Sequence, residues 1–182
     1  MEFKNYMDEL LEDYDREDHE DILETACAIS AGDKEVVKQV TYAIDKPKQY
    51  FKDNAEHFDE RGIYFDDDEF ADELDVDELL FLAMVDELEQ HGYVIELDWK
   101  IGLEDFLWGL KQIKNYNLIS DVIQNVKFDE DKNIEAWGKE LNAVLGGKVH
   151  ICYIHIDGDS YPLAIVADET LRSIPIPMVI SI

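Results

Sequence analysis

Apolar residues recur at three- and four-residue steps through most of the first 90 residues, which is the spacing of amphipathic helices. Gly32 suits the position just past a helix end, and Asp33 can cap the helix that follows. Pro47 suits a first helical turn, and Asp75 with Glu78 resembles a capping box. The pattern predicts helices at residues 3–14, 22–27, 36–44, 47–60 and 76–91. The first half of the chain is therefore expected to be helical.

Extended segments are predicted only in the second half of the chain. Residues 93–98 combine β-branched and aromatic residues with polar ones at alternate positions, which predicts a strand. Two further extended runs, 148–156 and 161–167, flank a turn at 157–160 whose composition is that of a hairpin connection. The run 148–156 is apolar at both parities, so we expect an inner strand, and 176–182 is expected to add an edge strand. Helices are predicted between these segments at residues 103–113, 118–126 and 134–145.

These elements predict an α+β fold in which an N-terminal helical layer packs on a small, mainly antiparallel sheet with a C-terminal β-hairpin. A chain of 182 residues is long enough for one compact domain, 1–182. An internal division is expected near 62–75, where the sequence is most acidic. It would separate an acidic helical part, 1–65, from an α+β part, 75–182.

The excess of acidic residues limits the possible partners. The chain has 44 Asp and Glu against 16 Lys and Arg, and residues 1–91 alone hold 30 acidic against 8 basic residues. Phosphate backbones and anionic membranes are bound through Lys and Arg, so neither nucleic acid nor a membrane is an expected partner. Two interpretations remain: a solvated face, or a surface that attracts a basic protein. The candidate contact residues are Asp66, Asp67, Asp68 and Glu69.

The compartment is predicted from what the sequence lacks. The first residues have neither the basic start nor the apolar stretch of a secretory signal, and no apolar run approaches the roughly 20 residues that cross a bilayer. Cys27 and Cys152 are the only cysteines, and we expect both to be buried and reduced. The predicted location is cytoplasmic, and no statement about oligomeric state follows.

Sequence motifs for catalysis and cofactor binding are absent. The sequence has no GxSxG, P-loop, GxGxxG or HExxH pattern, so no cofactor is predicted. Asp129, Asp131, Asn133 and Glu140 occupy ligand positions of a calcium-binding loop. Ile134, however, stands where that loop needs Gly, which favours a helix capped by Asp131 or Asn133.

The hairpin turn is the best candidate for a ligand or metal site. Asp157, Asp159, Ser160 and Tyr161 follow one another closely, and Asp98 joins them if the two strands are neighbours. Carboxylates and a phenol at one hairpin end would form a polar rim able to hold a small ligand or a cation. The alternative is ordinary turn chemistry, because Asp and Gly suit such turns without any ligand.

Several segments of the second half are similar to a bacterial family described as a domain of unknown function. They are LDWK at 97–100, EDF at 104–106, Trp108, Trp137 and DSY at 159–161. The resemblance covers roughly residues 90–172 and implies no activity and no catalytic residue. This chain departs from the family in Gly158, where serine is common, and in Gly138, where cysteine is common. Trp99, Phe106 and Trp108 are interpreted as packing residues.

Two functions from different classes follow. The first is an acidic protein-binding module, of the inhibitor or immunity-protein kind, that docks on a basic partner. The alternative is a metal-assisted enzyme that uses carboxylates of the hairpin turn and of residues 98–105. A purely regulatory or oligomeric role stays open as a third interpretation.

Overall fold

The structure of the chain is a computed structural model that describes residues 11, 14–60, 63, 75–156, 159–175 and 179–182. The predicted first helix lies almost entirely outside the described residues. The same is true of the acidic segment Asp66–Glu69 and of Asp157 in the hairpin turn.

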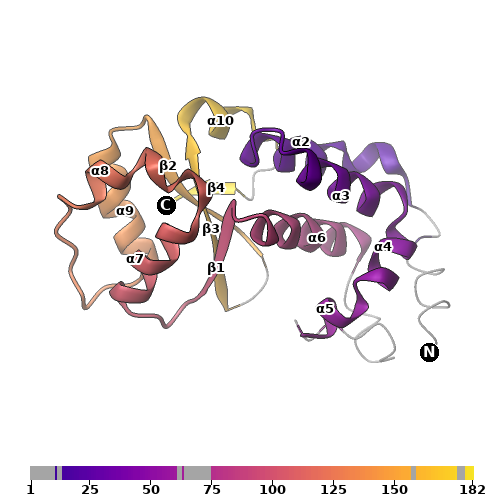
Figure 1. Ribbon diagram of the computed structural model, residues 1–182, viewed down its shortest axis with the longest axis horizontal. Coiled ribbons are helices and arrows are strands. Elements are labelled where there is room, and N and C mark those ends of the chain that lie inside the picture. Colours follow the sequence, from indigo (N-terminus) through magenta and orange to yellow (C-terminus); the bar gives the residue numbers. More distant parts are fainter. Residues whose placement is uncertain (1–10, 12–13, 61–62, 64–74, 157–158, 176–178) are drawn as a thin grey trace.

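A four-stranded antiparallel sheet forms the middle of the molecule (Figure 1). The order is β1-β3-β2-β4, so the hairpin strands β2 and β3 are the two inner strands. In the pairing of β1 with β3, Val94 lies opposite Ala164 and Asp98 lies opposite Ser160. The strands are β1 (Val94–Asp98), β2 (Val149–Ile154), β3 (Ser160–Ala167) and β4 (Val179–Ser181). The predicted inner strand, hairpin and edge strand are confirmed.

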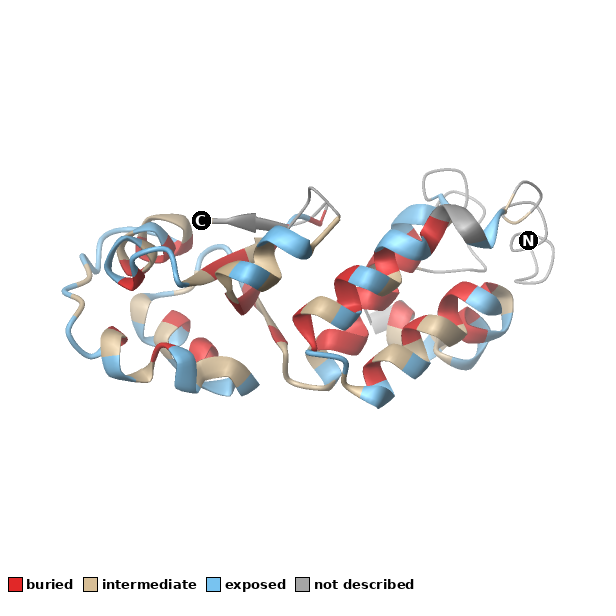
Figure 2. Cartoon of the chain, turned by 90° about the horizontal axis from the view of Figure 1, so that it is seen from above, coloured by how far each residue is buried: buried red, intermediate tan, exposed pale blue. Residues whose placement is uncertain are grey.

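One face of the sheet is covered by the helices of the first half together with the short helix α10. Their apolar side chains form one core with Val94, Cys152, Ile154, Ala164 and Val166 of the sheet. Buried residues lie on the sides of the helices that face one another (Figure 2). The elements are η1 (Arg16–His19), α2 (Glu20–Ile29), α3 (Lys34–Asp45), α4 (Pro47–Asp53), α5 (Ala55–Glu60), α6 (Val76–Gln90) and α10 (Asp168–Ser173).

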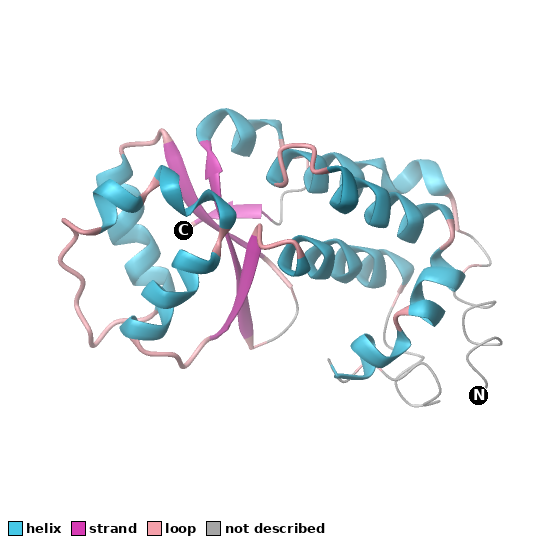
Figure 3. Cartoon of the chain, viewed as in Figure 1, coloured by secondary structure: helices cyan, strands magenta, loops and turns pink. Residues whose placement is uncertain are grey.

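The other face of the sheet is covered by a second group of helices (Figure 3). Leu97, Ile151, Leu163 and Ile165 of the sheet belong to a core that also contains the buried Trp137. Because neighbouring residues of a strand point to opposite faces, β3 supplies both cores in alternation. The elements are α7 (Leu103–Gln112), η2 (Lys114–Leu118), α8 (Ser120–Ile123) and α9 (Ile134–Leu145). The α+β class is confirmed, with helices on both faces.

Local sequence explains where the helices begin and end. The Asp33 carboxylate accepts a hydrogen bond from the Glu35 amide, and the Asp75 carboxylate accepts one from the Glu78 amide, so both predicted caps are confirmed. Pro47 stands in the first turn of α4, as expected. The predicted helix over 47–60 is divided at Asn54 into α4 and α5.

Asn142 of α9 fastens the end of the chain to the sheet. Its side-chain amide donates to the carbonyl oxygens of Ile151 and Ile182, at 2.9 and 2.6 Å. Its side-chain oxygen accepts from the Ile151 amide at 2.7 Å. One side chain thus bonds three backbone groups next to the β2–β4 pairing, and of these the Ile151 carbonyl also accepts from the Ile182 amide at 3.2 Å.

Helix α6 is buried along most of its length, including two adjacent carboxylates, Asp86 and Glu87, which are 1% and 4% exposed. The Tyr50 hydroxyl donates to Glu87 Oε1 at 2.8 Å, and His91 Nδ1 lies 3.8 Å from Glu87 Oε2. His57 Nε2 lies 3.1 Å from Asp86 Oδ2. Burial raises the pKa of Glu87 above its ordinary value, against the opposing effects of Tyr50 and the two histidines.

The two cysteines differ from each other. Cys152 is buried, and burial raises the pKa of its thiol to about 12. Cys27 is exposed, so the prediction that both thiols are buried is wrong for this one, because α2 turns it away from the core. No described helix combines the length and the apolar composition that a membrane crossing requires.

Replacing Asn142 by Ala should lower the free energy of unfolding by about 1–2 kcal/mol, because the Ile151 amide and the Ile182 backbone oxygen lose their side-chain partner. Urea denaturation measures this directly. Asn125→Ala is the matched control, because its side chain donates to one exposed carbonyl, that of Asp121. A loss of equal size in both variants would contradict the role given to Asn142.

Replacing Glu87 by Gln should increase stability, and the gain should grow as the pH rises. The folded protein holds the Glu87 proton more tightly than the unfolded chain does, so wild-type stability falls between the ordinary pKa of glutamate and the raised pKa of Glu87. The variant carries no such charge. Thermal unfolding from pH 4 to pH 8 would test this, with the exposed Glu24→Gln as control. A variant that loses stability at high pH would contradict it.

Candidate functional site

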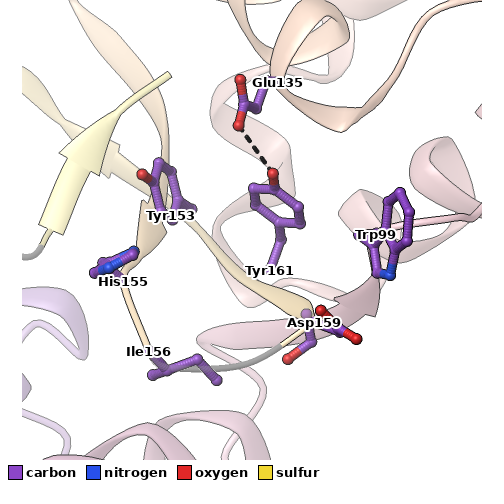
Figure 4. A pocket seen from close by; sticks show the side chains of 8 residues that line it. Trp99, Glu135, Tyr153, His155, Ile156, Asp159 and Tyr161 are labelled. Atoms are coloured by element: carbon purple, nitrogen blue, oxygen red, sulfur yellow. Dashed lines mark hydrogen bonds between the residues drawn. The ribbon is translucent and has the colours of Figure 1, made fainter.

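The described residues form a pocket where the hairpin meets the end of β1. The pairing of Asp98 with Ser160 continues by one hydrogen bond, in which the Trp99 amide donates to the Asp159 carbonyl at 3.1 Å. This bond holds Trp99 beside the hairpin end, although about 60 residues separate the two segments. The pocket has a volume of about 380 Å³. Its lining residues are Trp99, Glu135, Tyr153, His155, Ile156, Asp159, Ser160 and Tyr161 (Figure 4).

Tyr161 stands at the centre of the pocket wall. Its hydroxyl donates to Glu135 Oε1 at 2.9 Å, which joins the hairpin to the start of α9 (Figure 4). Its ring meets the Tyr153 ring edge-on, with centroids 5.5 Å apart and planes at 67°. Burial raises the pKa of Tyr161, and the Glu135 carboxylate raises it further. Tyr161 is therefore a neutral hydrogen-bond donor at physiological pH.

The pocket is acidic and aromatic. Glu135 and Asp159 supply carboxylates, whereas the lining includes no lysine or arginine among the described residues. Lys100, just outside, places its Nζ 4.6 Å from the centre of the Trp99 ring. Such an arrangement favours positively charged groups, because both carboxylates and the faces of aromatic rings attract cations.

The predicted site residues differ in whether they line the pocket. Asp159, Ser160 and Tyr161 all line the pocket, and Asp157 lies outside the described residues. The Ser160 hydroxyl donates to Glu96 on the neighbouring strand. Asp98 lies beside the hairpin, as expected if the strands are neighbours, yet its carboxylate accepts from the Lys100 amide in a turn at 2.7 Å.

Five of the lining side chains were not predicted as site residues. Trp99 was interpreted as a packing residue, but it is 48% exposed, and Trp108 on α7 is 57% exposed, so this interpretation is wrong for both. Phe106 is buried as predicted. The hairpin pairing could have identified Tyr153, because Tyr153 lies opposite Leu163 and so points to the same face of the sheet as Tyr161. His155 follows the last residue of β2, and its ring centroid lies 6.1 Å from that of Tyr153.

The described residues do not include a group of three His, Cys, Asp or Glu side chains placed to hold a metal ion. At the segment that resembled a calcium loop, Asn133 caps α9 by accepting from the Ala136 amide at 3.1 Å. Glu140, the last of the ligand positions there, pairs with Lys132 at 2.6 Å. The capped-helix interpretation is therefore confirmed.

Among known proteins, no curated protein and no solved structure matches the chain. A family model described as "Domain of unknown function (DUF6630)" matches residues 19–174. The match includes the segments at 97–108, 137 and 159–161, and it extends through the helical half, well before the residue 90 at which the resemblance in the sequence began. The chain therefore belongs to the DUF6630 family.

Proposed function

We propose that this protein is an acidic binding module that docks on a basic protein partner, with the hairpin-end pocket as its contact point. The observation that supports the proposal is the composition of the pocket. Tyr153, Tyr161 and Trp99 provide aromatic surface, and Glu135 with Asp159 provide negative charge, in a hollow large enough for a side chain.

The net charge supports the same proposal by a separate argument. With a formal net charge of −28, carboxylates stay uncompensated even if every Lys and Arg pairs with one. Lys114 of the second half pairs with Asp33 of the first at 3.4 Å, so internal pairing uses some of the available cations. The remaining field accelerates encounter with basic molecules and repels acidic ones. Long-range attraction would bring the partner close, and the pocket would then hold one of its side chains.

The metal-assisted enzyme stays a prediction without an observation that favours it. The carboxylate of Asp98 is used in a turn, and Ser160 is engaged with Glu96. Asp157 lies outside the described residues, so the complete set of candidate ligands is not placed. Calorimetry with calcium, magnesium and manganese separates this alternative from the binding module, because only the enzyme requires a stoichiometric metal site.

Binding can be tested with a short, unstructured peptide of mixed lysine and arginine. We expect saturable binding that is about tenfold weaker in Asp159→Asn and in Trp99→Ala, because each change removes one attraction for a cation. The matched controls are Asp121→Asn and Trp108→Ala, which alter an exposed Asp and an exposed Trp outside the pocket lining. Isothermal titration calorimetry would measure all five proteins.

The salt dependence of the same peptide provides a second criterion. The association rate in stopped-flow fluorescence should fall steeply as salt rises, because steering by a net charge of −28 is screened. Two results would contradict the proposal. One is equal weakening by pocket and control variants, and the other is an association rate that does not depend on salt.

A further inference from the structure

We infer that the pocket at the hairpin end recognises the guanidinium group of an arginine side chain in the partner. The inference rests on the proposed function, because it names the group that the proposed contact point would hold. Two features of the pocket distinguish arginine from other cations: the angle between its rings and the placement of its carboxylates.

The rings form a corner. Tyr153 and Tyr161 meet at 67° with centroids 5.5 Å apart, so two aromatic surfaces bound one space (Figure 4). Guanidinium is flat and weakly hydrated, and when it stacks on an aromatic face its N–H groups point outward in its own plane, toward acceptors beside the ring. An ammonium is compact and strongly hydrated, so it gains less from such a corner.

The carboxylates offer several acceptors at separate places. Glu135 uses Oε1 to accept the Tyr161 hydroxyl, and a carboxylate has about four lone-pair sites, so acceptor capacity remains. The exposed Asp159 carboxylate makes no hydrogen bond or ion pair with another described residue. Guanidinium presents about five N–H donors in a fixed plane and can serve both acids at once. A quaternary ammonium donates no hydrogen bond and would leave the remaining acceptor sites of both carboxylates unused.

Three peptides identical except for one central residue, Arg, Lys or the neutral isostere citrulline, test the inference by calorimetry on the intact protein. We expect the arginine peptide to bind at least about tenfold more tightly than the lysine peptide, and the citrulline peptide to show no saturable binding. In Asp159→Asn, which alters an exposed side chain, and in Tyr153→Leu, the preference for the arginine peptide over the lysine peptide should fall to about threefold or less. Circular dichroism checks that both variants are folded.

The outcomes separate this inference from the proposed function. Equal affinity for the arginine and lysine peptides would overturn the arginine inference and leave the cation-binding module intact. Equal affinity for all three peptides, citrulline included, would overturn both. An arginine preference that Asp159→Asn and Tyr153→Leu both leave unchanged would show that the pocket does not provide it, and would overturn the inference as well.

Discussion

Strand β3 pairs with β1 on one side and β2 on the other, and the register of these two pairings decides which side chains meet at the hairpin end. With Asp98 opposite Ser160, Trp99 comes to lie beside Asp159, and Tyr161 faces the start of α9. A slip of one residue would turn Tyr161 to the opposite face and exchange the residues of the two cores. The pocket therefore depends on the same backbone hydrogen bonds that hold the sheet together.

Helices on both faces of the sheet make this register stable in a very acidic chain. Alternate residues of β3 enter two separate cores, so a slip by one residue would place side chains of the wrong size in both cores at once. Two carboxylates that the structure describes as buried, Asp86 and Glu87, lie next to histidines and a tyrosine, in the layer opposite the pocket. The other carboxylates whose burial is described are at least partly exposed, so their charge acts at long range, whereas the pocket acts only at contact.

Much of the fold could be predicted from local patterns, because helix caps, glycine stops and strand alternation depend on neighbouring residues. Asp33, Asp75 and Pro47 mark helix starts that the structure confirms. The periodicity of residues 103–145 predicts helices but does not say which face of the sheet they cover. Trp99 was misinterpreted for a related reason: an aromatic residue after a strand packs or projects according to contacts made far along the chain. Glu135 reaches Tyr161 only through the docking of α9, which no local pattern shows.

We propose that the hairpin-end pocket, rather than the acidic helices as a whole, makes the specific contact with a basic partner. Nuclear magnetic resonance of the isotope-labelled protein, titrated with the arginine peptide, can locate this contact residue by residue. We expect saturable shifts for the Trp99 indole N–H, the Tyr153 and Tyr161 rings and the Asp159 amide, and small, salt-sensitive shifts on α2 and α3. Shifts that gather on α2 and α3 and leave Trp99 and Tyr161 unchanged would contradict it.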